Sequence, residues 1–196
     1  NRRRVREIRD GLCAADIHVA FAFPNGIRAD CVDPEILQTL KEMGTYSVAI
    51  GVESGCQRML DRMRKGTSKD QIRAAFCAAR QLGLETWGFF LFGLPGEDQA
   101  SVAETIAFAL ELDPDVAKFH ILKPYPGSQV HAELREAGLI EDDDLAHYGI
   151  HTMPVHHLPG LSAHDLLAWQ QQAYRRFYLR PSTLLRAIRR QRSLHR

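Results

Sequence analysis

The segment ETWGFFLFGLPGED, residues 85–98, carries the strongest fold signal in the chain. Residues 85–92 are apolar on both faces, which is typical of a parallel strand covered on either side. The Gly-Leu-Pro-Gly turn that follows leads into a predicted helix over residues 98–112, whose apolar positions recur at helical spacing. A strand, a glycine turn and a helix in this order predict one unit of an α/β fold.

The same order of strand and helix occurs four times along the chain. The predicted strands are residues 16–23, which end at a Pro24-Asn25-Gly26 turn, and residues 46–51, 85–92 and 116–122. The predicted helices cover residues 34–43 after an Asp33 cap, 56–63, 69–82 after a Ser68 capping box, 98–112 and 129–137. This repetition predicts right-handed βαβ units and a parallel sheet. Four strands do not close a barrel unaided, so a barrel requires further strands.

Beyond residue 138 the pattern changes, so we expect two parts, residues 1–140 and 141–196. The second part holds an acidic run, a proline- and histidine-rich loop, a helix that begins at Ser162 and is broken by Pro181, and a basic helical tail over 182–196. That tail could bind nucleic acid or an anionic membrane. Its leucine face favours a packed amphipathic helix with solvated arginines.

Composition excludes several classes of protein. The chain has 196 residues, 45% hydrophobic and 25% charged, which argues against disordered, collagen-like and transmembrane classes. The net charge is +1, yet residues 172–196 hold eight arginines and no acid, so the preceding 171 residues sum to −7. No apolar stretch approaches the roughly 18 residues that a membrane span needs, and no signal-peptide pattern opens the chain, which makes the cytoplasm the default location. Because the first residue is Asn1 rather than methionine, we expect a piece of a longer protein.

Three predicted strand exits carry unusual sequences, and ligands of parallel α/β proteins meet that end of the strands. In GVESG (residues 51–55), glycines permit close backbone approach, and Glu53 with Ser54 could hold an ammonium or a ribose hydroxyl. The alternative is that both residues cap the next helix.

The other two exits follow residues 92 and 122. Backbone groups of Gly93, Leu94 and Pro95 could hold an adenine or ribose edge, whereas the alternative is a turn before acids in a helix's first turn. Lys123 could meet a carboxylate or simply reach solvent, and Pro124 with the next proline could form a purely structural turn.

Together these strings closely resemble the radical SAM superfamily. The runs GVESGCQRMLDRMRKGTS, GFFLFGLPGED and KFHILKPYPGSQV, preceded by Arg28-Ala29-Asp30, occur in the family's order and spacing over about residues 1–140. The branch with an upstream cobalamin-binding domain, and the methylthiotransferases, are most similar.

The resemblance implies a partial (βα) barrel in which a [4Fe–4S] cluster and S-adenosylmethionine yield a 5′-deoxyadenosyl radical. It implies that Glu53 and Ser54 contact the methionine or ribose part of the cofactor, and that Gly93, Leu94 and Pro95 lie beside adenine. Lys123 and Pro124 would form the last strand's edge, with Arg28 and Tyr125 toward a small-molecule or lipid-like substrate. It further implies a redox partner and, in the cobalamin branch, cobalamin.

This sequence departs from the family in its cysteines and in one motif. Cys13, Cys31, Cys56 and Cys77 are 18, 25 and 21 residues apart and cannot supply a C-x-x-x-C-x-x-C loop. We therefore expect the cluster ligands outside this chain, and the chain alone to be inactive. Glu97 falls one position late for the fifth-strand signature G-x-I-x-G-x-x-E.

Three further interpretations are weaker. A metal site formed by His151, His156 and His157 lacks a partner ligand at set spacing. A non-catalytic remnant that acts as a binding module is the main alternative to an enzyme. A closed-shell methyltransferase would need a G-x-G loop after its first strand, which this sequence does not have.

Overall fold

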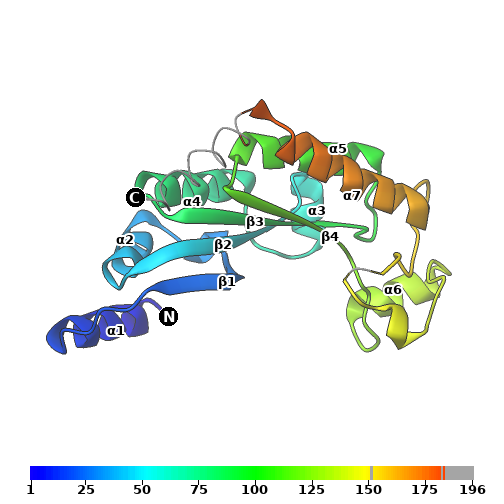
Figure 1. The fold of residues 1–196 in the computed structure, drawn as a ribbon. Helices are drawn as coiled ribbons and strands as arrows, with labels where there is room; N and C mark the ends of the chain where they lie inside the picture. The colour runs from blue at the N-terminus through cyan, green and yellow to red at the C-terminus, as the bar shows by residue number, and fades with distance from the viewer. Residues whose placement is uncertain (151, 182, 184–196) are drawn as a thin grey trace.

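The computed structural model describes residues 1–150, 152–181 and 183 (Figure 1). Its helices and strands are α1 (Arg2–Ala14), β1 (Phe21–Arg28), α2 (Pro34–Glu42), β2 (Thr45–Glu53), α3 (Gln57–Arg62), α4 (Lys69–Gln81), β3 (Glu85–Phe92), α5 (Gln99–Leu112), β4 (Val116–Ile121), α6 (Gln129–Glu136) and α7 (Ala163–Tyr178). His151 and nearly all of the predicted tail helix over 182–196 lie outside the described residues.

The four strands form one parallel sheet in the order β1-β2-β3-β4. A parallel sheet of neighbouring strands joined by helices confirms the predicted α/β fold, a partial (βα) barrel followed by a C-terminal helix. Because the strands are parallel, their carboxyl ends all lie at one edge of the sheet.

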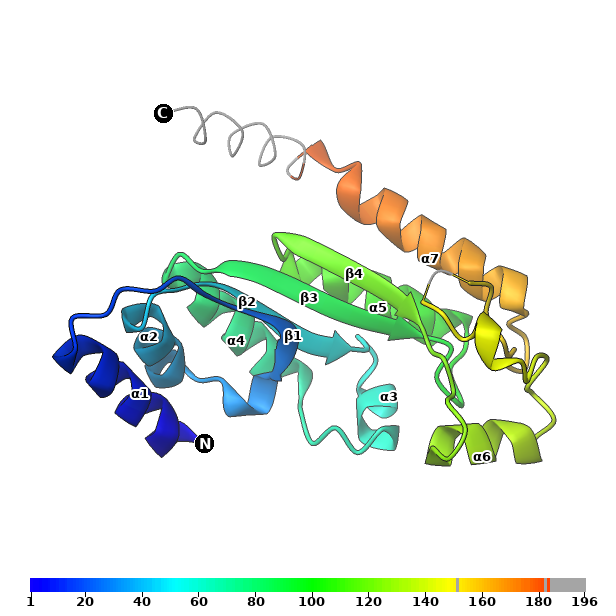
Figure 2. The same cartoon turned by 60° about the horizontal axis from the view of Figure 1, so that its bottom comes forward.

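Helices α2, α4 and α5 cover one face of the sheet. Helices α4 and α5 pack against β3, α2 packs against β2, and α7 runs along β4 (Figure 2). On this face Ile50, Phe90 and Phe119 are almost fully buried. On the opposite face the side chains of β3 are only half-buried, so the prediction of a strand covered on both sides is wrong for the described residues.

β1 differs from the predicted strand. It begins at Phe21 and continues through Pro24-Asn25-Gly26, which forms a bulge instead of the predicted turn. Phe23 pairs with Val48 and Ile27 with Ile50, so the extra residues on β1 loop out between these pairs. The bulge lets both Phe23 and Ile27 pack against the cluster of Ile36, Leu40 and Met43.

Helix α7 is held against the outer edge of β4 by three polar side chains. Gln170 Nε2 donates to the Phe119 carbonyl at 2.7 Å, and Tyr178 accepts from the Ala117 amide and donates to its carbonyl. Tyr174 makes the same pair of contacts with Phe119. These bonds satisfy backbone groups that an edge strand otherwise leaves unpaired.

The segment after residue 140 also contributes to the main core. Leu166, Ala173 and Phe177 of α7 belong to the same buried cluster as the strands. The division of the chain at residue 140 stays a prediction. No helix in the described ranges is both long and apolar enough to cross a bilayer.

Candidate functional site at the carboxyl edge of the sheet

The predicted strand exits converge at one edge of the sheet. Arg28 at the end of β1 pairs with Gly51 of β2, and Glu53 pairs with Phe90 of β3. Gly93 directly follows β3, so Arg28, Glu53 and the Gly93 loop end neighbouring parallel strands. This shared edge is where ligands of open parallel sheets bind.

Glu53 ends β2 in a strained backbone conformation, with φ at +65°. Its Oε1 accepts a hydrogen bond from Lys65 Nζ at 2.5 Å, and the Lys65 carbonyl accepts one from Arg28 Nη2 at 2.7 Å. A Cβ at Gly51 would lie 2.8 Å from Glu53 Oε1, so the glycine makes room for this carboxylate. The side chain keeps 27% of its surface exposed and remains accessible. Sequence reasoning missed Lys65, since no spacing rule connects it to Glu53.

Arg28 is fixed by an acidic neighbour. Its Nε and Nη2 donate to the two carboxylate oxygens of Asp30 at 3.0 and 2.8 Å. The hydrogen bond from Arg28 is the main reason that the pKa of Asp30 lies below its usual value. Arg28 thus links the end of β1 to the loop between α3 and α4, and the Lys65 side chain continues this link to Glu53 at the end of β2.

Ser54 lies beneath the edge and is fully buried. Its hydroxyl is 3.1 Å from Thr105 Oγ1 and accepts a hydrogen bond from the Cys56 amide at 3.1 Å. The residue therefore anchors the loop after β2 to α5, and its predicted cofactor contact stays a prediction. The N-cap of α3 is Cys56, with no capping side chain.

The Gly93 loop is held from within by Glu97. Glu97 Oε2 accepts from the Gly93 amide at 2.6 Å and from the Leu94 amide at 3.3 Å. Burial raises the pKa of Glu97 to about 7, against the opposing effect of these two hydrogen bonds. Glu97 precedes α5, whose N-cap is Asp98, so it is not a first-turn acid. In the sequence, the sign of a role for Glu97 was its near match to the last position of the motif G-x-I-x-G-x-x-E.

His156 holds the same loop from the other side. It is fully buried, and its Nε2 lies 2.8 Å from the Gly93 carbonyl oxygen. Burial lowers the pKa of His156, so the imidazole is neutral and Nε2 donates its proton to the carbonyl. Gly93 has a positive φ, +83°, a conformation that favours glycine at this position.

Lys123 and Tyr125 fasten the exit of β4 to the following loop. Lys123 Nζ donates to the His147 carbonyl at 3.2 Å, to Thr152 Oγ1 at 2.9 Å and to the Met153 carbonyl at 2.5 Å. Tyr125 donates to the Tyr148 carbonyl at 3.1 Å. Pro124, which lies between Lys123 and Tyr125 in the sequence, is buried. In this structure these residues bind the chain itself.

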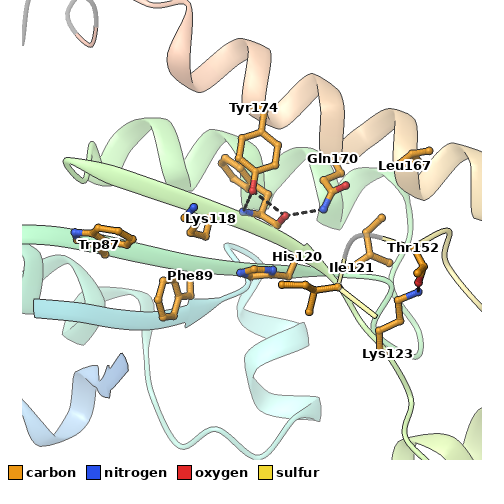
Figure 3. A pocket seen from close by; sticks show the side chains of 12 residues that line it. Trp87, Phe89, Lys118, His120, Ile121, Lys123, Thr152, Leu167, Gln170 and Tyr174 are labelled. Atoms are coloured by element: carbon orange, nitrogen blue, oxygen red, sulfur yellow. Dashed lines mark hydrogen bonds between the residues drawn. The ribbon is translucent and has the colours of Figure 1, made fainter. Parts of the chain in front are cut away.

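Two cavities border the site. One, of about 500 Å³, lies between the open face of β3 and β4, helix α7 and residues near Thr152 (Figure 3). The other, of about 290 Å³, lies beside Leu94 and Pro95 and is closed by Met59, Arg62 and Glu133.

The described residues contain no group of three histidine, cysteine or acidic side chains that could hold a metal. Cys56 is buried, whereas Cys13, Cys31 and Cys77 are exposed. His156 contacts Gly93, and His157 lies 2.9 Å from Glu141. The described thiols therefore do not fit an iron–sulfur cluster, which needs cysteines held together.

Comparison with known proteins relates the chain to one family. Residues 2–109 match the Radical SAM superfamily. The chain is 32% identical over 161 residues to an uncharacterized methyltransferase of Pyrococcus horikoshii, covering 82% of this chain and 35% of that protein. It is 26% identical over 184 residues to the anaerobic magnesium-protoporphyrin IX monomethyl ester cyclase of Rubrivivax gelatinosus, covering 94% and 33%.

Solved structures share the fold. Coproporphyrinogen III oxidase from Escherichia coli, a radical SAM enzyme, matches with a TM-score of 0.61 and 18% identity over 91% of this chain and 37% of that one. The methyltransferase TsrM from Kitasatospora setae, solved with cobalamin and a [4Fe–4S] cluster, matches with a TM-score of 0.57 and 21% identity over 68% and 25%.

The chain spans about a third of the length of these two curated relatives. The matched residues 2–109 contain β1, β2 and β3 and the loops at their carboxyl ends. On this match and on its parallel strand order, the chain belongs to the Radical SAM superfamily.

Proposed function

We propose that this chain forms the part of a radical SAM enzyme that binds S-adenosylmethionine along the carboxyl ends of β2, β3 and β4. In this assignment Glu53 receives the polar methionine or ribose part of the cofactor. The backbone of Gly93, Leu94 and Pro95 borders its adenosyl part, and Pro124 closes the far side. Arg28 and Tyr125 lie toward the substrate.

One observation carries the proposal: an accessible carboxylate and a glycine-marked backbone loop end adjacent strands at the same edge. Glu53 accepts from Lys65 through Oε1, which leaves Oε2 for a ligand hydroxyl or ammonium group. Gly93 is held in place by Glu97 and His156, so its loop needs little ordering when a ligand arrives. These features fit an adenosyl ligand.

The cluster is different, because the described cysteines do not fit it. The proposal therefore places the cluster ligands and the docking site of a redox partner outside this chain. In this family, adenosylmethionine with a reduced cluster supplies a 5′-deoxyadenosyl radical. This chain's own residues would bind and orient the adenosyl group.

The names of the relatives favour methyl transfer or a carbon-skeleton reaction. They include methyltransferases and a cyclase. The methyl-transfer form of the proposal includes a cobalamin-binding segment elsewhere in the polypeptide, by analogy with TsrM, whose solved structure contains cobalamin.

The test uses the full-length gene product that contains this chain, with its cluster reconstituted. Reduced protein given adenosyl-labelled S-adenosylmethionine is expected to release labelled 5′-deoxyadenosine. Glu53→Gln should weaken equilibrium binding of the cofactor about tenfold, as for loss of one charge-assisted hydrogen bond. Glu136→Gln, at an exposed position of α6, is the matched control and should bind normally.

Absence of 5′-deoxyadenosine in the reduced, cluster-loaded protein would overturn the catalytic assignment. If cofactor binding were also unaffected by Glu53→Gln, the alternative of a non-catalytic binding module would take its place.

A further inference from the structure

The lining of the larger cavity does not include the Gly93 loop. The cavity extends over β3 and β4 on the face opposite α2, α4 and α5, and α7 borders it along the edge of β4 (Figure 3). Its volume, about 500 Å³, falls in the range of small-molecule sites.

The floor of this cavity is aromatic. Trp87 and Phe89 alternate with buried residues along β3, so both side chains project from the open face of the sheet. His120 on β4 packs edge-on against Phe89, with ring centroids 6.3 Å apart. Ile121 and Leu167 add aliphatic surface, and Figure 3 shows these side chains around one space. Such a floor suits a flat, apolar group.

The charge of the cavity is positive. Its described lining includes Lys118 and Lys123 and contains no aspartate or glutamate. Lys123 already donates to three oxygens of the following loop. Lys118 Nζ instead lies 5.8 Å from the centre of the Trp87 ring, and none of the ion pairs between described residues involves Lys118. A cation beside an aromatic surface and without an acidic partner favours an anionic ligand group.

We propose that this cavity binds a planar, apolar substrate that carries an anionic group, with its ring system on Trp87 and Phe89 and its anionic group on Lys118. This assignment deepens the proposed function and rests on it only in calling the ligand the substrate. The cavity's preference for planar anions follows from the residues themselves.

The experiment measures binding of two matched probes to the full-length gene product. 2-Naphthoate carries a flat ring and a carboxylate, whereas 2-naphthamide carries the same ring and a neutral amide. We expect naphthoate to bind about tenfold more tightly, by isothermal titration, as for one charge-assisted hydrogen bond. Lys118→Met should remove this difference and leave naphthamide binding unchanged, because the variant keeps the apolar stem.

Two further variants complete the set. Trp87→Leu should weaken both probes, and Lys41→Met, at an exposed position of α2, should weaken neither. Thermal unfolding of each variant verifies that it folds. Equal affinity for the two probes, or an unchanged naphthoate affinity in folded Lys118→Met, would overturn the proposal.

The outcome is independent of the cofactor assay. Charge-selective probe binding without 5′-deoxyadenosine formation would overturn the proposed function and support the planar-anion site. Formation of 5′-deoxyadenosine without charge-selective binding would support the proposed function and overturn the planar-anion site.

Discussion

His156 Nε2 donates a hydrogen bond to the carbonyl oxygen of Gly93 across 2.8 Å, although the two residues are 63 positions apart. The histidine lies in the loop before α7, and the glycine directly follows β3. The carboxyl-terminal part of the chain thus fixes the loop that we assign to the adenosyl group. The Gly93 carbonyl is thereby satisfied in a buried site, while Glu97 holds the amides of the same loop.

Replacing His156 should therefore destabilise the fold. His156→Leu removes the donor and leaves a buried carbonyl unsatisfied, which costs about 1–3 kcal/mol of unfolding free energy. His156→Gln, whose side-chain nitrogen reaches a similar position, should recover part of that loss. Denaturant unfolding measures both. His164→Leu, at an exposed site on α7, is the control and should change stability by less than about 0.5 kcal/mol. Equal losses in the Leu and Gln variants would contradict a role for the donor.

Glu97 should make stability depend on pH. Its pKa is about 7 in the folded protein against an ordinary value of 4.5, so between these values the folded state keeps a proton that the unfolded chain releases. The stability contributed by this proton is fully present below pH 4.5 and is lost as the pH rises through 7. The loss amounts to about 3 kcal/mol.

The check compares denaturant unfolding of the native protein with Glu97→Gln from pH 4.5 to pH 8. The variant cannot ionise, so its stability relative to the native protein should rise by about 3 kcal/mol over this range. His156 has a lowered pKa and acts in the opposite direction, but it is present in both proteins and cancels in the comparison. Glu136→Gln should keep the native pH dependence. A constant difference between native protein and Glu97→Gln would show that Glu97 does not bind this proton.

Two buried threonines offer a matched test of the loop that carries Ser54. Thr105 Oγ1 accepts from the Gly55 amide at 3.0 Å and contacts Ser54, whereas Thr45 Oγ1 has no hydrogen-bond partner among the described residues. Thr105→Val should cost about 1–3 kcal/mol, because the Gly55 amide is left unpaired. Thr45→Val should be neutral or stabilising, since it removes an unsatisfied hydroxyl. Similar losses in both variants, by thermal or denaturant unfolding, would argue against the Thr105 contact.

The regular part of the fold could be predicted from the sequence because it depends on local patterns. The predicted caps at Asp33 and Ser68 are present, and the helix predicted to begin at Ser162 has that residue as its N-cap. β3 has the predicted bounds of 85–92. β1 was predicted wrongly because Pro24-Asn25-Gly26 resembles a turn, whereas packing of Phe23 and Ile27 against α2 keeps the chain in the sheet as a bulge.

The site could be predicted only in part. Parallel strand order brings Arg28, Glu53 and Gly93 together at the carboxyl ends of the strands, as the sequences of the strand exits indicated. The partners that hold them could not be predicted, because Lys65 and His156 come from loops placed by tertiary packing. The burial of Ser54 is likewise set by Thr105 on α5, about fifty positions away. The cofactor roles of these residues stay predictions.

The contacts between α7 and β4 limit where the sheet can be extended. Tyr174, Tyr178 and Gln170 occupy backbone groups of β4 that another strand would need for pairing. In the described part of the chain, the outer edge of β1 pairs with no strand. Any strand added to this sheet can therefore pair only next to β1, so α7 leaves the sheet one direction in which it can be extended.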